Sequence, residues 1–244
     1  MGAVHQILLA GGVTDPYLGS VKLLMPFSAS TTTDSNIVQA NTITTVGSPS
    51  ISAATTKWGV GSLDVNAAAA EETVRIIGPS DFRTSTAASF TLEMWLYPIS
   101  TATNGGGSVM CNAVLSLHSA SPTTNANCVG LIWWDATSGG RIGFLNSGYY
   151  ASAAPNTWHH YAYVQDAVAN QRRLYCNGSQ VGFSLSASAL NFIAIQAGNS
   201  GAAAATANGS WQNYVTLMRM EQLRFTDGVC RYNGASYTVP TGPF

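Results

Sequence analysis

Two pairs of adjacent aromatic residues are the feature of this sequence best suited to contact a ligand. Trp133 directly precedes Trp134, and Tyr149 directly precedes Tyr150. Exposed indole and phenol rings offer a flat apolar face together with a polar group, which suits them to stacking against sugar rings. Neighbouring strand residues point to opposite sides of a sheet, so one ring of each pair is expected in the core and the other at the surface. We therefore take Trp134, Tyr149 and Tyr150 as candidate glycan-stacking residues.

Residue combinations typical of catalysis or metal binding are missing. His159 and His160 are adjacent, so on a strand they cannot bind one ion together. A glycosidase needs two carboxylates across a cleft, whereas Glu93 stands alone in its apolar segment and no E-x-D-x-x-E pattern occurs. Asp34 lies in the oxygen-rich stretch TTTDSN, but calcium needs several oxygen ligands. The sequence predicts no enzyme, no metal site and no cofactor.

Charge argues against two classes of partner. The 244 residues include 10 Lys and Arg against 11 Asp and Glu, which gives a net charge of -1. Nucleic acids and anionic membranes attract clustered positive charge, so we expect neither as a partner. Only 9% of the residues are charged, and a weakly charged surface gives a free monomer little colloidal repulsion. We therefore expect part of the surface to lie against partners or copies of the same chain.

The chain reads as one strand-rich domain with a short arm before it. From Val21 onward, short apolar segments rich in aromatic and β-branched residues alternate with Ser, Thr, Gly and Asn, a pattern typical of a sandwich. Phe90 to Tyr97 is apolar at alternate positions, and Asn177-Gly178 predicts a tight hairpin turn. Residues 28–56 are expected to form a loop. The predicted domain spans residues 21–244 and the arm residues 1–20.

The arm carries the apolar residues Val4, Ile7, Leu8 and Leu9. We expect them to contact a partner by strand addition or in a groove; the alternative is that they pack on their own sandwich. No cationic region precedes this short apolar stretch, so no signal peptide is expected.

Six segments of the chain occur in an order typical of one family. They are VKLLMPFSASTTTDSN (21–36), KWGVGSLDV (57–65), FTLEMWLYP (90–98), TWHHYAYVQD (157–166), RLYCNGSQVG (173–182) and LRFTDGVCRYNGASYTVPTGPF (223–244). Together they resemble the laminin-G-like family of concanavalin A-type jelly rolls, in the form found in bacteriophage virion proteins. The resemblance implies an all-β fold, a jelly-roll sandwich of two antiparallel sheets.

The recurrent positions of that family fall on framework residues rather than on an active site. They are Glu93, Trp95, Trp158, His160, Asn177, Gly178, Leu223, Arg224, Arg231 and Tyr232. A carboxylate in a chain so poor in charge needs a cationic partner, and we predict that Glu93 pairs with Arg224.

The resemblance, the low charge and the arm favour a non-enzymatic bacteriophage virion structural protein. Our first expectation is a capsid decoration, or cement, protein that binds and stabilises the head surface. Its partners would be capsid or other virion proteins, its location the virion, and its form a homo-oligomer, with a trimer favoured. The alternative is a tail or fibre-tip module that binds a host glycan receptor. Aromatic residues grouped in an open patch would favour the glycan module, whereas a flat apolar base with an extended arm would favour cement.

Overall fold

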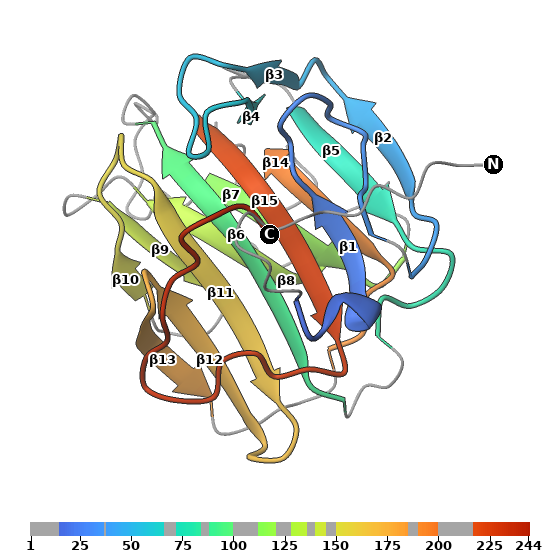
Figure 1. The fold of residues 1–244 in the computed structure, drawn as a ribbon, viewed down its shortest axis with the longest axis vertical. Coiled ribbons are helices and arrows are strands. Elements are labelled where there is room, and N and C mark those ends of the chain that lie inside the picture. The colour runs from blue at the N-terminus through green and yellow to red at the C-terminus, as the bar shows by residue number, and fades with distance from the viewer. Residues whose placement is uncertain are drawn as a thin grey trace.

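The computed structural model describes residues 15–36, 38–65, 72–83, 88–99, 112–120, 128–135, 140–144, 150–184, 190–199 and 217–244. Nearly all regular structure within these ranges is β-strand (Figure 1). The elements are η1 (Leu18–Ser20), β1 (Val21–Met25), β2 (Thr42–Val46), β3 (Ser50–Ser52), β4 (Ser62–Val65), β5 (Glu72–Ile77), β6 (Phe90–Pro98), β7 (Asn112–His118), β8 (Cys128–Asp135), β9 (Arg141–Phe144), β10 (Tyr150–Ser152), β11 (His159–Asp166), β12 (Gln171–Cys176), β13 (Ser179–Ser184), β14 (Ala194–Asn199) and β15 (Met218–Asp227). In this part of the chain, no helix has the length and apolar character needed to cross a bilayer.

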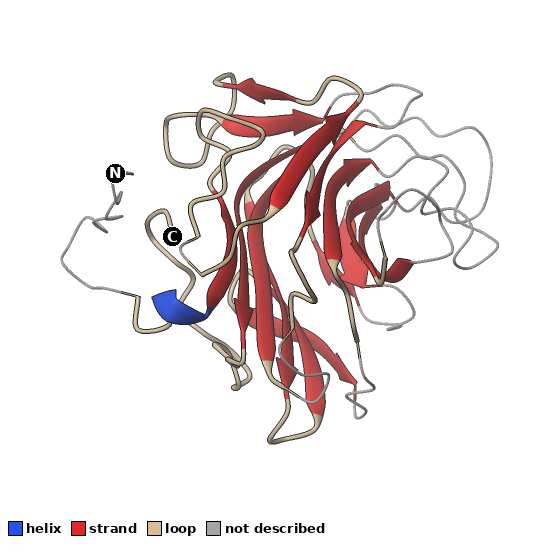
Figure 2. Ribbon diagram, turned by 90° about the vertical axis from the view of Figure 1, so that its right-hand side faces the viewer, coloured by secondary structure: helices blue, strands red, loops and turns tan. Residues whose placement is uncertain are grey.

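The strands form two antiparallel sheets that face each other. Sheet A has eight strands in the order β13-β12-β11-β6-β15-β4-β3, and β1 also pairs with β15. Sheet B has seven strands in the order β10-β9-β8-β7-β14-β5-β2. Figure 2 shows the sheets as two facing layers. The predicted all-β sandwich of two antiparallel sheets is confirmed.

Alternating side chains on β6 show how the core forms between the sheets. Phe90, Leu92, Met94 and Leu96 are at most 1% exposed and belong to one core cluster. The residues between them point to the opposite side of sheet A, which we call its outer face. Four phenylalanines from distant segments meet in the core, with ring centroids 5.3 to 6.2 Å apart: Phe82, Phe90, Phe192 and Phe225.

The hairpin predicted at Asn177-Gly178 is confirmed. β12 ends at Cys176 and β13 begins at Ser179, and the two turn residues have φ angles of 50° and 80°. Two successive positive φ angles match the twist of the flanking strands, and glycine adopts such an angle without steric cost. A Cβ atom on Gly178 would also lie 2.4 Å from the carbonyl oxygen of Tyr237, so glycine is required here twice over.

The expectation of a loop over residues 28–56 is wrong in part, because this stretch contains β2 and β3. β2 is the last strand of sheet B and β3 the last of sheet A. Edge strands bury little of their surface, and in β2 only Ile43 and Val46 are partly buried. The Thr-rich segment TITTV therefore lacks the clear apolar alternation by which a strand is recognised from sequence.

Residues 228–244, which we call the C-terminal strap, cross the outer face of sheet A (Figure 1). Backbone hydrogen bonds hold the strap to β13 and its turn: Gln180 N–H donates to Ala235 O at 2.9 Å, and Tyr237 N–H donates to Gly178 O at 2.8 Å. The N–H of Phe244 donates to Oε1 of Gln222 at 2.9 Å. Polar side chains on this face of sheet A are thereby removed from water.

Candidate functional site

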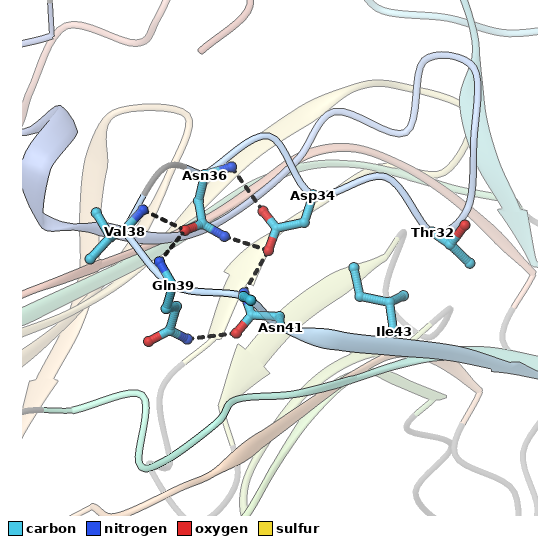
Figure 3. Close-up of a pocket in the computed structure, with 8 residues that line it drawn as sticks. Thr32, Asp34, Asn36, Val38, Gln39, Asn41 and Ile43 are labelled. Atoms are coloured by element: carbon cyan, nitrogen blue, oxygen red, sulfur yellow. Dashed lines mark hydrogen bonds between the residues drawn. The ribbon is translucent and has the colours of Figure 1, made fainter. Parts of the chain in front are cut away.

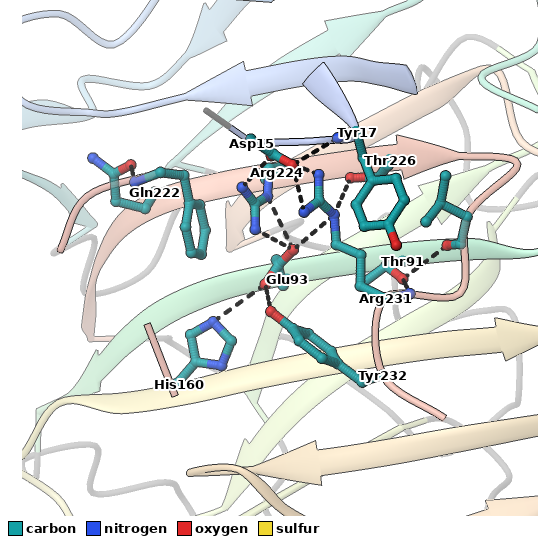
Figure 4. A network of polar contacts seen from close by, with 12 residues as sticks. Asp15, Tyr17, Thr91, Glu93, His160, Gln222, Arg224, Thr226, Arg231 and Tyr232 are labelled. Carbon is teal, nitrogen blue, oxygen red and sulfur yellow. Dashed lines mark hydrogen bonds and ion pairs between the residues drawn. The ribbon is translucent and has the colours of Figure 1, made fainter. Parts of the chain in front are cut away.

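The strap covers a cluster of charged side chains on the outer face of sheet A (Figure 4). Glu93 on β6 is 0% exposed. Its Oε1 accepts hydrogen bonds from Nε and Nη2 of Arg224, at 2.9 and 2.8 Å. Its Oε2 accepts one from the Tyr232 hydroxyl at 2.6 Å and lies 3.5 Å from Nε2 of His160. Both carboxylate oxygens of Glu93 are thus occupied by protein groups.

Asp15 connects the first described residues to this cluster. Its Oδ2 accepts hydrogen bonds from Nη1 of Arg224 at 3.1 Å and from Nη2 of Arg231 at 2.8 Å, and its Oδ1 accepts one from Nη1 of Arg231 at 3.1 Å. Arg231 belongs to the C-terminal strap, and Arg224 to β15. The described part of the predicted arm, residues 15–20, and the strap are therefore fixed to sheet A by one ion network.

The network determines the protonation states of its members. Burial alone would raise the pKa of Glu93, but Arg224, His160 and Arg231 together hold it well below the usual range of a glutamate. Burial and the charge of Glu93 raise the pKa of the Tyr232 hydroxyl. At neutral pH the carboxylate is ionised and the phenol protonated. A buried carboxylate with its oxygens occupied cannot reach a substrate, so the network serves the framework.

The predicted pair of Glu93 and Arg224 is confirmed by these distances. His160, Arg231 and Tyr232, which the family resemblance also implied as framework residues, belong to the same cluster. Among the described residues, no group of three or more His, Cys, Asp or Glu side chains is placed to hold a metal ion.

Trp134 does not present its ring to solvent, contrary to the prediction of a stacking residue. Its side chain is 2% exposed and belongs to the core cluster, and its indole N–H donates to the carbonyl oxygen of Ala153 at 2.9 Å. The alternation of β8 explains the correction: Ile132 and Trp134 face the core, so Trp133 between them lies on the outer face of sheet B.

Tyr150 is exposed, as predicted. It lies on β10 with 51% of its surface accessible, and the guanidinium carbon of Arg141 lies 4.6 Å from its ring centroid. Tyr150 is paired with Gly143 of β9, and Gly143 is paired with Trp133 of β8. Three neighbouring strands therefore place a tyrosine, a glycine and a tryptophan in one row on the outer face of sheet B.

Gly143 allows the Trp133 ring to lie over β9. A Cβ atom at this glycine would be 2.3 Å from Cζ2 of Trp133 and 2.7 Å from its Cε2. No side chain other than hydrogen fits beneath the indole in this position. We call Trp133, Arg141, Gly143 and Tyr150 the aromatic platform. Of the two tryptophans, Trp133 and not the predicted Trp134 is therefore the partly exposed one, and the glycine opposite Trp133 is the sequence signal for this difference.

The other predicted contact residues lie outside the described residues. They are Tyr149, proposed for stacking, and the arm residues Val4, Ile7, Leu8 and Leu9. Their roles stay predictions.

The chain resembles known proteins in sequence and in fold. Residues 72–229 match a family model described as the concanavalin A-like lectin/glucanases superfamily. No curated protein matches the sequence. Among solved structures, one described as a receptor binding domain aligns with a TM-score of 0.53 at 10% identity, over 86% of this chain and 48% of that chain.

Two further structures align similarly. The binding domain of botulinum neurotoxin serotype D gives a TM-score of 0.52 at 8% identity, over 87% of this chain and 49% of its own. The carbohydrate recognition domain of Emp47p gives 0.53 at 11% identity, over 89% of this chain and 100% of its own. The chain thus spans about half the length of the first two structures. At these identities the likeness shows a shared fold.

Proposed function

This chain belongs to the concanavalin A-like lectin/glucanases superfamily, and from that premise we propose that it is a non-catalytic module that binds a glycan receptor. The structures it resembles are described as receptor-binding and carbohydrate recognition domains, which favours recognition over capsid decoration. In line with the family resemblance of the sequence, such a module would act at the tail or a fibre tip of a bacteriophage particle. Fold alone does not fix function, so the proposal rests on one site.

The aromatic platform carries the proposal. Tyr150 is 51% exposed, and Trp133 is partly exposed beside it on the same face of sheet B. Tyrosine and tryptophan rings on a rigid sheet give contact area at a low cost in conformational entropy. Arg141 on β9 adds a guanidinium 4.6 Å from the Tyr150 ring centroid, which brings positive charge to this face. A pyranose ring has both the apolar face and the polar rim that such a surface recognises.

Two buried glutamates favour binding without catalysis. Glycoside hydrolysis needs two carboxyl groups that both reach the scissile bond. Glu93 is 0% exposed, and Glu221 is 2% exposed. Burial raises the pKa of Glu221, as in a general acid, but its Oε1 already accepts the backbone N–H of Lys57 at 2.6 Å. Neither group is available to a sugar in this structure.

Tyr150→Ala is expected to weaken glycan binding at least about tenfold, because the variant removes the most exposed ring of the aromatic platform. Tyr150→Phe keeps the ring and is expected to stay within about threefold of the unmodified protein. A glycan array identifies the ligand for the unmodified chain, and isothermal titration calorimetry then compares the three proteins.

Thermal unfolding of each variant provides the control, since an exposed residue contributes little to stability. Equal binding by Tyr150→Ala and the unmodified protein would remove the aromatic platform as the site. Absence of binding to any glycan would remove the proposed function itself.

Capsid decoration is the second candidate, favoured by the position of Asp15. Asp15 lies within the predicted arm and is held by Arg224 and Arg231 on the outer face of sheet A, which gives this part of the arm a fixed attachment point on the domain. Quantitative mass spectrometry of purified particles separates the two candidates. A copy number close to that of the major capsid protein would support decoration, whereas a few copies would support a tail module.

A further inference from the structure

A polar pocket lies at the opposite end of sheet B from the aromatic platform. Sheet B begins with β10, which carries Tyr150, and ends with β2. The pocket has a volume of about 740 Å³ and is formed by β2 and by the segment that joins β1 to β2. Figure 3 shows Thr32, Asp34, Asn36, Gln39, Asn41 and Ile43 around it.

The carboxylate of Asp34 is fully occupied. Its Oδ1 accepts hydrogen bonds from the backbone N–H groups of Leu24 and Asn36, both at 3.0 Å. Its Oδ2 accepts hydrogen bonds from the side-chain amides of Asn36 and Asn41. A carboxylate offers about four lone-pair sites, and these four donors use them all. Asp34 therefore has no lone pair left for a calcium ion, and its role is to orient the amides around it.

The amide of Asn41 is held from two sides. Besides Asp34, its Nδ2 donates to the backbone carbonyl oxygen of Lys22 at 2.8 Å. Its Oδ1 accepts one hydrogen bond, from Nε2 of Gln39 at 2.6 Å, which leaves one lone pair. Lys22 and Asp34 therefore fix the orientation of the Asn41 side chain, and its Oδ1 is held in place as an acceptor.

Gln39 has the largest unused hydrogen-bonding capacity in the pocket. One of its two amide hydrogens goes to Asn41, while the other, and the Oε1 acceptor, make no hydrogen bond to any described residue. Asn36 likewise uses one amide hydrogen, on Asp34, and keeps one. These free groups are neutral and include both donors and an acceptor, and hydroxyl groups of a ligand can satisfy both kinds.

The polar atoms and the apolar side chains of the pocket restrict the chemical class of ligand further. An anionic ligand would have to lie beside the carboxyl oxygens of Asp34, which are themselves acceptors and have no hydrogen to donate to it. A metal ion finds no free oxygen on Asp34. Ile43 is partly buried and Val38 is 42% exposed, so apolar surface adjoins the amides. The ligand that meets these conditions has neutral hydroxyls and an apolar C–H face.

We infer that this pocket binds a neutral saccharide unit without a metal ion, with Gln39 and Asn41 as its hydrogen-bond partners. The inference rests on the proposed function and adds a second site to it, at the far end of sheet B from Tyr150. A glycan receptor then contacts the module at two separate places, and the two contacts can be removed independently.

Side-chain amide NMR tests the pocket directly. The probes are the methyl glycosides of glucose, galactose and mannose, with N-acetylneuraminic acid as the acidic comparison, each in buffer containing EDTA. At least one neutral glycoside is expected to shift the side-chain amide signals of Gln39 and Asn41, and the acidic sugar to leave them unchanged. Gln39→Met keeps the size of the side chain and is expected to lower the affinity of that glycoside about tenfold.

Gln180→Met is the matched control, because Gln180 lies on β13 of sheet A. It is expected to bind as the unmodified protein does, and thermal unfolding verifies that both variants are folded. Shifts that require added calcium, shifts only with the acidic sugar, or an unchanged affinity of Gln39→Met would each overturn the inference. Binding that survives Gln39→Met but is lost in Tyr150→Ala would overturn the pocket while leaving the proposed function intact. Failure of every glycan, on the array and by NMR, would remove both.

Discussion

Replacing Arg224 by methionine is expected to lower the free energy of unfolding by about 3–5 kcal/mol, the cost typical of leaving a buried charge without its partner. Glu93, which is 0% exposed in the unmodified protein, loses both hydrogen bonds to its Oε1. The strap loses a contact as well, since the guanidinium carbon of Arg224 lies 3.8 Å from the ring centroid of Phe244. Urea unfolding followed by tryptophan fluorescence measures the loss.

Arg219→Met on the same strand is the matched control. Arg219 lies 3.5 Å from Asp64, and the two side chains are 16% and 17% exposed. A more accessible pair at this distance contributes less than about 1 kcal/mol. Equal losses in the two variants would show that Glu93 and Arg224 are not specially coupled.

Acid is expected to destabilise the protein as the pH falls through about 4.5, close to the pKa of a glutamate in an unfolded chain. Glu93 resists protonation in the folded state: burial would raise its pKa, but Arg224 and its neighbours hold that pKa well below the usual range. Asp15 behaves alike, because Arg231 and Arg224 outweigh the effect of its burial and lower its pKa. The unfolded chain therefore takes up more protons, and lowering the pH favours it. A carboxyl group whose pKa is lower by about two units in the folded state contributes about 2.6 kcal/mol, which is lost in acid.

Urea unfolding at a series of pH values tests this expectation. The free energy of unfolding should depend less on pH in Arg224→Met, because this variant lacks the positive charge that lowers the pKa of Glu93 most. A stability that stays constant from about pH 6 to about pH 3 would contradict the expectation.

Local rules predicted those parts of the fold in which one residue type is required. At Asn177-Gly178 the backbone itself demands two positive φ angles, so two letters of sequence were enough to locate the hairpin. The pair of Glu93 and Arg224 was predicted because the chain has few charged residues and a lone carboxylate inside an apolar strand needs a cationic partner. In both places a single physical requirement left few alternatives.

The candidate site depended on information that the local sequence does not contain. Apolar residues occupy consecutive positions of β8 around Trp133 and Trp134, so the sequence of β8 does not show which ring faces the core. The pairing with β9 decides it, because Gly143, opposite Trp133, lies on the outer face of sheet B. The pocket was missed for a related reason. Asp34 appeared as a lone carboxylate, because its donors come from Leu24, Asn36 and Asn41, which the fold gathers around it.

The outer face of sheet A and the outer face of sheet B differ in the groups through which the protein can be immobilised on a sensor surface. Asp15 and Phe244 both contact Arg224 on the outer face of sheet A, whereas the aromatic platform is on sheet B. The chain's two lysines are also on the sheet A side: Lys22 on β1 pairs with Asp227 at 3.0 Å, and Lys57 lies 4.2 Å from the ring centroid of Trp95. A sensor chip that captures the protein through its lysines, or through a tag after Phe244, will leave Trp133 and Tyr150 facing the analyte.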